Sequence, residues 1–402
     1  MRRVKLGQIC EVVSGGTPKT NVEEYWNGEF NWITPAEIND NDYIISDTKR
    51  KITQLAIEKK KLPLLPKGTV LLSSRAPIGK VAITGKEMYC NQGFKNLICS
   101  DEICNEYLYW YLKSKKEYLN SLGRGATFKE ISKKIVENIE IKLPEIERQR
   151  KIVDKLKKVD KIIQRRKNQS RLLDVVVQAR FVEMFGDPII NNMSWSESTI
   201  GDGCFVTKLA GFEYSKYIEY DDTGDVVMVK AQNVKNGTLN RKDLSFISNE
   251  VSDALPRSQL LPGDVVMTYV GANIGDVALI DDKYKYHLAP NVAKIRVDAK
   301  IYNSVYFMYM LMFLNSYIVK NSADTAKAAL GMERIRKLKV FIPTYDLQNQ
   351  FAAFVQQVNK SKFVIHKFLY CTTHNTQSII KPRPNTKESG KTRGGKPYAD
   401  EF

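Results

Sequence analysis

The most regular alternation of apolar and polar residues lies between positions 145 and 185. No Pro or Gly interrupts this segment before Gly186, and Pro144 stands where a proline often precedes the first turn of a helix. Apolar residues recur at spacings of four and three. This heptad spacing predicts a helix of roughly 40 residues, about 60 Å long, with one apolar stripe. The stripe includes Ile152, Leu156, Val159, Ile163, Leu173, Val177 and Met184. Three polar residues interrupt it in the same register, namely Arg166, Ser170 and Arg180.

A second stripe of the same kind begins near Tyr345, after Ile342-Pro343. It consists of Phe351, Val355, Val358, Ile365 and Leu369. The pattern fades past Tyr370, so we expect this helix to be shorter than the first. Each apolar stripe must be covered, and the simplest arrangement packs the two helices against each other as an antiparallel coiled coil. Pairing of the helices between two chains of a dimer is the alternative.

The segments before the two long helices have a different residue pattern. Short β-branched runs, such as 69–72, 80–84 and 96–99, are separated by Gly, Pro and Asn, as expected of strands joined by loops. Apolar residues at helical intervals then predict a helix over 105–122. The second half repeats this order, with a helix at 300–320. The expected fold class is therefore α+β, with two similar mixed domains that are each followed by a long helix.

Part of the sequence occurs twice. Residues 65–83 read LPKGTVLLSSRAPIGKVAI and residues 261–280 read LPGDVVMTYVGANIGDVALI, which is the same turn, strand, loop and second strand. The period is too long for a solenoid repeat. In an antiparallel helix pair, two similar domains would be related by a pseudo-two-fold axis and would suit a bipartite, linear ligand. The expected domains are 1–142 and 187–342, the long helices are 143–186 and 343–377, and a basic tail without stable structure follows at 378–402.

The composition of the chain indicates which class of partner it could bind. The formal net charge is +17, from 62 Lys and Arg against 45 Asp and Glu. This excess favours a polyanionic partner such as nucleic acid, although lysine-rich compositions also arise without one. No stretch approaches the roughly 18 apolar residues of a membrane span and no signal-peptide core is found, so a cytoplasmic location is expected. The six cysteines and three histidines are scattered, which argues against a zinc site and favours reduced thiols.

Motifs for catalysis on nucleic acid are missing from the sequence. The nearest approach to a phosphate-binding loop, Gly79 to Glu87, has one residue too many between its glycines, and Glu87 stands where Ser or Thr is needed. An adenine methyltransferase would carry Asn/Asp-Pro-Pro-aromatic, whereas the nearest segment reads Asp187-Pro188-Ile189-Ile190. We find no GxGxxG after a strand, no HExxH and no GxSxG. We therefore expect no catalytic residue, metal site or cofactor in this chain.

Several segments, taken in order, resemble a known family. They are SGGTPKT followed by YWNGEFNWITPAEI within 14–38, the repeated block at 65–83, NQGFKNL at 91–97, GRGATFKEIS at 123–132 and LPEIERQRKIV at 143–153. Together with the duplication and the long helix, they resemble the specificity subunit of type I restriction-modification systems over residues 4 to about 370. The resemblance implies two target-recognition domains that each read one half of a split double-stranded DNA sequence, with paired helices that fix the gap.

The resemblance also implies that partner chains carry the chemistry. Methylation would belong to two methyltransferase (modification) subunits that use S-adenosylmethionine, and cleavage to two restriction subunits that use ATP and Mg²⁺. The helices would bind the modification subunits as well as each other, which would account for the polar residues in the first stripe. Two alternatives are a stand-alone DNA-modifying enzyme and a coiled-coil scaffold without DNA affinity. Turnover by the purified chain would identify the first, and a missing salt-dependent DNA shift the second.

Base reading needs a few side chains from loops or helix ends in the major groove, while other groups bind phosphates. We expect these side chains among the polar residues on the repeated loops. In the first domain the candidates are Thr17, Lys19, Arg75, Lys80, Gln92, Lys95, Arg124, Thr127 and Lys129. In the second domain they are Lys230, Gln232, Asn233, Tyr269, Asn273, Asn291 and Lys327. The loops differ between the copies while IGKVA and IGDVA are retained, so we expect two unlike half-sites rather than a palindrome.

Overall fold

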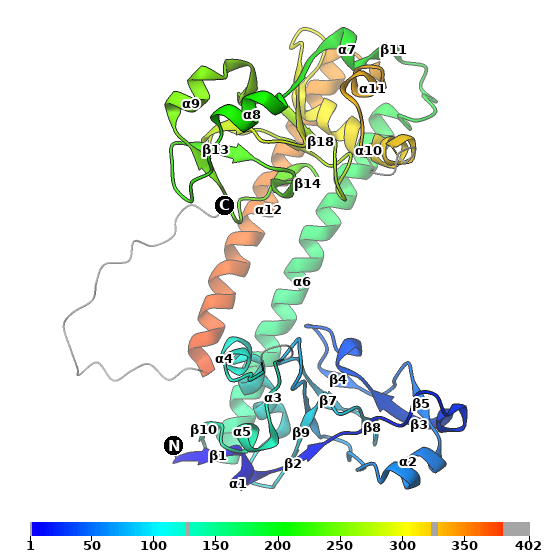
Figure 1. Ribbon diagram of the computed structural model, residues 1–402, viewed down its shortest axis with the longest axis vertical. Helices are drawn as coiled ribbons and strands as arrows, with labels where there is room; N and C mark the ends of the chain where they lie inside the picture. The colour runs from blue at the N-terminus through cyan, green and yellow to red at the C-terminus, as the bar shows by residue number, and fades with distance from the viewer. Residues whose placement is uncertain (1, 126–128, 323–328, 381–402) are drawn as a thin grey trace, which may run out of the picture. The chain divides into compact units, whose positions relative to one another are not determined.

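The computed structural model describes residues 2–125, 129–322 and 329–380 (Figure 1). The chain forms two compact units. Unit 1 holds the described residues up to Arg166 and those from Phe368 on, and unit 2 runs from Lys167 to Lys367. Thr127, Lys327 and all but the first three residues of the predicted tail at 378–402 lie outside the described residues.

Unit 1 contains the first mixed domain, whose core is built on two sheets. The strands are β2 (Cys10–Ser14), β3 (Trp26–Ile33), β4 (Ile44–Ile45), β5 (Lys51–Ile52), β6 (Val70–Leu72), β7 (Val81–Thr84), β8 (Tyr89–Cys90) and β9 (Lys95–Cys99). The helices are α1 (Leu6–Ile9), α2 (Gln54–Lys60), α3 (Asn105–Lys113), α4 (Lys116–Ser121) and α5 (Lys133–Glu137). One sheet has the order β2-β9-β6-β7-β4 and the other the order β5-β3-β8. Because β6, β7 and α3 are rich in apolar side chains, they close over a common core that includes Leu72, Ile83 and Leu108.

Unit 2 contains the second mixed domain. Its strands are β12 (Cys204–Lys208), β13 (Val226–Val229), β14 (Val234–Lys235), β15 (Thr238–Leu239), β16 (Phe246–Ile247), β17 (Gln259–Leu260), β18 (Val265–Thr268), β19 (Val277–Leu279), β20 (Lys285–Leu288) and β21 (Val292–Val297). Its shorter helices are α7 (Ile200–Gly203), α8 (Gly211–Tyr217), α9 (Asn249–Ala254), α10 (Ser304–Ser322) and α11 (Met332–Arg336). The sheets have the orders β12-β21-β18-β19 and β16-β13-β20-β17, and β14 pairs with β15.

The two domains share one topology, which confirms the expected α+β class and the duplication. The order β12-β21-β18-β19 repeats β2-β9-β6-β7, and β13 lies antiparallel to β16 and parallel to β20, as β3 lies to β5 and β8. The registers also correspond: Ser14 lies opposite Lys95 in unit 1, and Lys208 lies opposite Ala293 in unit 2. Positions in one domain can therefore be matched to positions in the other by strand register alone.

Each domain is closed by pairing of its first and last strands. In unit 1, β1 (Arg2–Lys5) runs antiparallel to β10 (Glu140–Leu143), and in unit 2, β11 (Ser196–Thr199) runs antiparallel to β22 (Lys339–Ile342). Both last strands lead directly into a long helix. The chain therefore begins and ends each domain at neighbouring positions.

A buried glutamine joins each long helix to its domain. Gln149 accepts a hydrogen bond from the backbone N–H of Cys104 (2.8 Å) and donates to the carbonyl oxygens of Glu102 and Pro144 (2.9 Å each). Gln348 makes the same set of bonds with Asn303 N (2.8 Å), Ile301 O (3.0 Å) and Pro343 O (2.9 Å). Both side chains are fully buried and satisfy backbone groups that would otherwise lack partners.

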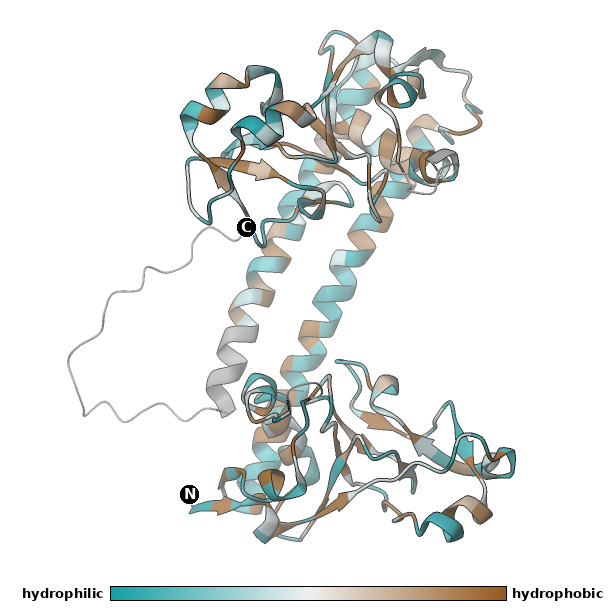
Figure 2. Cartoon of the chain, viewed as in Figure 1, coloured by the Kyte–Doolittle hydropathy of each residue, from teal (hydrophilic) through white to brown (hydrophobic). Residues whose placement is uncertain are grey.

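The two long helices are nearly equal in length. The first, α6 (Ile146–Phe185), has 40 residues, as its heptads predict, and the second, α12 (Tyr345–Ile380), has 36. The second helix is shorter than the first, as expected, but only by four residues. Within unit 2 the helices pack antiparallel: Phe181 contacts Phe351 (ring centroids 5.4 Å apart), Asp174 pairs with Lys362 (2.6 Å), and Ser170 bonds His366 (3.2 Å). Figure 2 shows polar and apolar residues alternating along both helices.

The predicted stripe residues divide between the two units. In unit 2, Val177, Phe351, Val355 and Val358 belong to one core, with Leu173 packed against it. In unit 1, Leu156 lies in the core of the first domain and Ile152 packs against that core, so both residues join the helix to its own domain. The other predicted stripe residues are buried (Met184 and Ile365) or half-buried (Val159, Ile163 and Leu369).

The helix predicted over 105–122 is broken into α3 and α4. Ser114 bonds back to the carbonyl oxygen of Tyr111 (2.7 Å), and Lys115 leaves the helical conformation at φ −110°, ψ 17°. The break turns α4 so that its polar residues reach the loops of the domain, as described below. The helix predicted at 300–320 is α10 and begins four residues later. In the part of the chain that is described, no helix is both long and apolar enough to cross a membrane.

Candidate nucleic-acid interface

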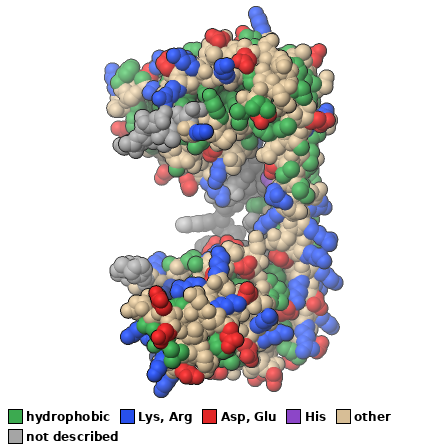
Figure 3. All heavy atoms as spheres, turned by 90° about the vertical axis from the view of Figure 1, so that its right-hand side faces the viewer, with side chains coloured by type: hydrophobic (Ala, Val, Ile, Leu, Met, Phe, Trp, Pro, Cys, Tyr) green, Lys and Arg blue, Asp and Glu red, His purple; other side chains and the backbone are tan. Residues whose placement is uncertain are grey.

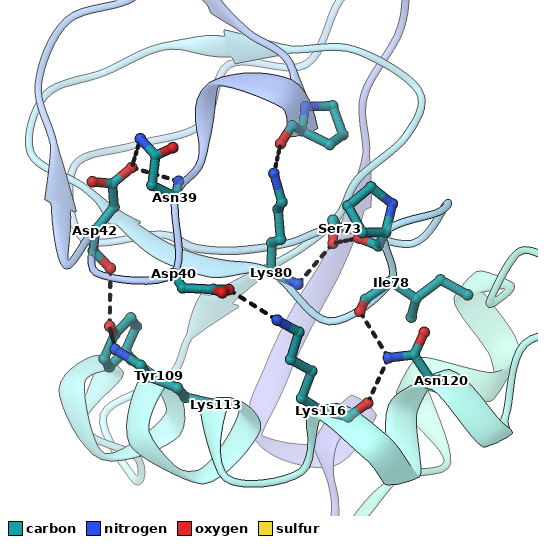
Figure 4. A network of polar contacts seen from close by, with 12 residues as sticks. Asn39, Asp40, Asp42, Ser73, Ile78, Lys80, Tyr109, Lys113, Lys116 and Asn120 are labelled. Carbon is teal, nitrogen blue, oxygen red and sulfur yellow. Dashed lines mark hydrogen bonds and ion pairs between the residues drawn. The ribbon is translucent and has the colours of Figure 1, made fainter. Parts of the chain in front are cut away.

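The loop between β6 and β7 carries Arg75 and is held by a network of polar contacts (Figure 4). Ser73 Oγ donates to the carbonyl oxygen of Pro77 (2.7 Å) and accepts from the N–H of Lys80 (2.8 Å). The ammonium of Lys80 donates to the carbonyl oxygen of Pro35 (3.0 Å) in a neighbouring loop. The loop is thus fixed at both ends, and Lys80 is half-buried and bonded within the domain.

Helices α3 and α4 support this loop and the adjacent segment at 39–42. Asn120 donates to the carbonyl oxygen of Ile78 (3.2 Å), and Lys116 pairs with Asp40 (2.9 Å). The hydrogen bond from Lys116 lowers the pKa of the Asp40 carboxyl. The hydroxyl of Tyr109 donates to the carbonyl oxygen of Asp42 (2.9 Å), as Figure 4 shows. The broken helix therefore positions two loops at once.

Two tryptophans hold the loop that contains Thr17 and Lys19. The indole of Trp32 donates to the carbonyl oxygen of Gly16 (3.0 Å), and the indole of Trp26 donates to that of Lys19 (3.2 Å). The guanidinium of Arg50 stacks on the Trp26 ring at 3.9 Å from its centroid. Thr17 also bonds the side chain of Gln92, which lies in a third loop. The loops of Thr17 and Gln92 are therefore in direct contact.

Glu130 joins two further candidates. Its carboxylate accepts from Arg75 Nε (2.9 Å) and from Lys95 Nζ (3.1 Å). The backbone bonds of Glu130 are made with Arg124, in both directions, at 3.0 and 2.9 Å. Segments that are 55 and 35 residues away in sequence therefore meet at one acidic residue.

The candidate loops of unit 2 use a different set of polar contacts. Asn233 is buried and donates to the carbonyl oxygen of Asn240 (2.9 Å), while its own amide oxygen accepts from the N–H of Lys230 (3.0 Å). The ammonium of Lys230 donates to Ser245 Oγ (2.8 Å). In the loop after β18, the N–H of Tyr269 donates to the carbonyl oxygen of Asn291 (2.9 Å).

The structure divides the sequence-predicted DNA residues by exposure. Eight are exposed and available to a ligand: Lys19, Arg75, Gln92, Arg124, Lys129, Gln232, Asn273 and Asn291. Four are half-buried: Thr17, Lys80, Lys230 and Tyr269. Lys95 and Asn233 are buried, and the contacts above account for their polar atoms. Thr127 and Lys327 lie outside the described residues.

Sequence reasoning missed several residues that organise these loops. Glu130 stands in the GRGATFKEIS segment, but nothing in the sequence relates it to Arg75 or Lys95. Lys208 lies with its ammonium 5.5 Å from the centroid of the Tyr269 ring and is exposed. The buried roles of Gln149 and Gln348 could have been found, because both stand at the same place in the repeated segment, near the start of each long helix.

Positive charge is concentrated on the first long helix. Residues 146–171 contain eleven Lys or Arg and three Asp or Glu, whereas α12 contains three Lys and one Asp. Figure 3 shows Lys and Arg side chains gathered along the helical segment as well as scattered over the domains. No group of three or more His, Cys, Asp or Glu within the described ranges is placed to hold a metal ion.

Lys294 is a buried cation whose removal should change the pH dependence of stability. Its ammonium donates to the carbonyl oxygens of Arg257 (2.7 Å) and Gln259 (2.8 Å), and burial lowers its pKa from 10.5 to about 8. Between these two pH values the unfolded chain binds more protons than the folded one, so Lys294 makes stability rise with pH. We expect the free energy of unfolding of the wild type, relative to Lys294→Met, to rise by up to about 1.4 kcal/mol per pH unit from about pH 8 to about pH 10.

This expectation can be checked by denaturant unfolding of both proteins, labelled with 5-fluorotryptophan. Trp195 is the only tryptophan within unit 2, so its ¹⁹F signal reports that unit. Lys242→Met serves as the control because Lys242 is exposed. Parallel pH profiles for wild type and Lys294→Met would contradict the expectation.

The chain is similar to known DNA-specificity proteins over most of its length. A family model described as Type I restriction modification DNA specificity domain matches residues 1–170 and 192–369. The MjaIX type I restriction enzyme specificity subunit of Methanocaldococcus jannaschii is 30% identical over 373 residues, which cover 88% of this chain and 85% of that protein. The EcoBI specificity subunit of Escherichia coli is 21% identical over 315 residues, which cover 70% of this chain and 65% of that protein.

Solved structures with the same fold have low sequence identity. The type I restriction-modification S subunit from M. genitalium matches with a TM-score of 0.52 at 15% identity, covering 94% of this chain and 95% of that one. A chain from a study of complex assembly and conformational transition of the type I R-M system matches with a TM-score of 0.59 at 17% identity, covering 94% and 96%. With a matching domain in each half, this chain belongs to the family of type I restriction modification DNA specificity domains.

Proposed function

We propose that the chain is the non-catalytic specificity subunit of a type I restriction-modification complex and binds double-stranded DNA. The observation that carries this proposal is the duplication of one domain topology with unlike loops, in a chain of this family. A single domain would suffice to bind one continuous site. Two copies with different exposed side chains suit two different half-sites.

Each domain would read its half-site through the exposed loop residues. In the first domain these are Lys19, Arg75, Gln92, Arg124 and Lys129, and in the second Gln232, Asn273 and Asn291. The loops in the first domain are in mutual contact, which keeps their side chains in a defined arrangement before DNA is bound. Rigid placement favours base reading because little side-chain freedom is lost on binding.

The long helices would set the gap between half-sites and bind two methyltransferase subunits, which carry the methylation chemistry and S-adenosylmethionine. Restriction subunits with ATP and Mg²⁺ would join the same complex. Within unit 2, α6 has apolar side chains that are 45–47% exposed, namely Leu172, Val175, Val176 and Val182. Exposed apolar residues on a helix that already has one partner suit contact with a further chain.

The test is to map methylated adenines in a genome that carries this chain together with its methyltransferase subunits. We expect a split, asymmetric motif that disappears when this chain is deleted. Purified chain alone should bind DNA in a salt-dependent manner and should not methylate or cleave it. Turnover by the chain alone would identify a stand-alone enzyme, and lack of DNA affinity in the assembled complex would identify a scaffold.

A further inference from the structure

Arg75, Glu130 and Lys95 form a chain of charges that runs from the domain surface into its interior. The side chain of Arg75 is 46% exposed, that of Glu130 34% and that of Lys95 9%. Lys95 begins strand β9, Arg75 lies in the loop after β6, and Glu130 precedes α5. Backbone bonds lock the three segments together, because Ser74 N–H donates to the carbonyl oxygen of Gly93 (2.7 Å), and Ile131 N–H to that of Ser74 (2.9 Å).

The geometry of the Arg75–Glu130 contact leaves the outer edge of the guanidinium available. Glu130 accepts from Nε of Arg75, and neither Nη atom donates to another of the described residues. The two Nη groups and their fixed spacing are the part of arginine that recognises a pair of acceptors on one plane. A contact through Nε therefore orients the side chain without occupying its recognition edge.

Lys95 balances the charge of Glu130, so Glu130 does not cancel the positive charge of Arg75. Its ammonium donates to the second carboxylate oxygen of Glu130 (3.1 Å) and lies near Ser74 Oγ (3.4 Å). Burial by itself would raise the pKa of Glu130, but hydrogen bonds from Lys95 and Arg75 bring the pKa below its usual value. With the carboxylate ionised and balanced by the buried Lys95, the three residues retain one net positive charge at the surface.

The second domain lacks all three residues at the matched positions. The bridge between Arg75 and Glu130 corresponds to the bridge between Val270 and Ala329. Lys95, opposite Ser14, corresponds to Ala293, opposite Lys208. Two cations and an anion are thus replaced together by three apolar residues, which is expected if the three residues act as a unit.

We propose that Glu130 positions Arg75 to read a guanine in the half-site of the first domain, and that Lys95 is the buried counter-ion of this pair rather than a DNA contact. Guanine presents two acceptors, O6 and N7, in the major groove, and an arginine reads both at once. The inference rests on the proposed function and assigns the base class that one loop recognises. It also predicts that the second domain does not recognise guanine through an arginine that is oriented by a glutamate.

The test uses the chain assembled with its methyltransferase subunits and duplexes in which each position of the wild-type site is varied in turn. Arg75→Ala should lose preference for guanine at one position of one half-site by roughly 5- to 150-fold. Glu130→Gln should relax the same position, to a smaller extent, and should leave the salt slope of binding unchanged. Glu147→Gln is the matched control, because Glu147 pairs with Arg150 on an exposed helical surface outside the loops.

A triple variant separates base reading from folding. Lys95→Ala, Arg75→Val and Glu130→Ala together reproduce the residues of the second domain at matched positions, so we expect a folded protein that has lost the same guanine preference. The result that overturns the proposal is an Arg75→Ala protein that weakens binding to all sequences equally and lowers the salt slope by about one, which marks a phosphate contact. An unchanged base profile in Glu130→Gln would also overturn it. A wild-type complex with no sequence preference would instead refute the proposed function.

Discussion

Lengthening both long helices by one heptad is expected to increase the preferred spacer by about three base pairs while leaving both half-sites unchanged. Seven helical residues add about 10.5 Å, and base pairs are stacked at about 3.4 Å. The insertions belong between Arg166 and Lys167 in α6 and between Lys367 and Phe368 in α12, where one compact unit ends and the other begins. Each unit then keeps its own core, and only the helical connection changes.

A longer spacer also rotates one half-site relative to the other, because the DNA duplex is twisted. Three base pairs turn the duplex by about 100°, whereas a heptad brings a coiled coil back to nearly the same face. We therefore expect the one-heptad variant to bind its best site more weakly than the wild type. Three heptads add about 31 Å, close to one turn of DNA, and should restore affinity with a spacer longer by about nine base pairs.

These spacer effects are measured by methylation mapping or by binding to duplexes with graded spacers. Seven residues inserted after Thr223, in an exposed loop of unit 2, provide a control that should leave the spacer preference unchanged. If the helix variants retained the wild-type spacer, the helices would not set the gap between half-sites.

Replacing Phe181 by alanine is expected to lower the free energy of unfolding of unit 2 by about 3–5 kcal/mol. Phe181 is 1% exposed and lies where three helices meet. Its ring stacks on Tyr306 and Phe313 of α10, with centroids 5.8 and 4.6 Å apart, and contacts Phe351 of α12 edge-on at 5.4 Å. The variant removes a large buried ring and leaves a cavity, so both transfer energy and packing are lost.

Denaturant unfolding followed by the ¹⁹F signal of 5-fluorotryptophan at Trp195 checks this prediction. The Trp195 indole donates to the carbonyl oxygen of Phe185 at the end of α6 (2.9 Å), so it reports this region directly. Phe212→Ala is the matched control, because Phe212 lies in the same unit and is 71% exposed; its effect should stay below about 0.5 kcal/mol. A loss of less than about 1 kcal/mol in Phe181→Ala would show that this cluster does not hold the helices to the domain.

The elements that could be predicted from sequence are those with a strong local signal. The predicted range of the first long helix, 143–186, differs from that of α6 by at most three residues at either end. The prediction is this close because the apolar spacing and the absence of Pro and Gly both indicate one continuous helix. The expected range of the second helix, 343–377, ends three residues before α12 does, because the apolar stripe fades past Tyr370 while the helix continues. No Pro or Gly occurs after Pro343 until Pro382, and α12 extends to Ile380.

The break between α3 and α4 and the roles of the loop residues depend on contacts far apart in sequence. Nothing local ends the helix at Lys113; α4 changes direction where Lys116 can reach Asp40 and Asn120 can reach Ile78. For the same reason, Lys95 could not be recognised as buried. A buried lysine needs a compensating acid, and that acid, Glu130, is 35 residues away.

The pairing of first and last strands in each domain bears on how new specificities can arise. Because β11 and β22 are neighbours, and because Gln348 anchors the following helix to its domain, everything between these strands is a cassette with adjoining ends. If the loops read DNA as proposed, a recombination event that exchanged the cassette would replace all recognition loops of one half-site in a single step. The helices, and with them the proposed partner surfaces, would remain as they were. A lineage with this architecture would then change what it recognises by exchanging domains, without a long series of single substitutions.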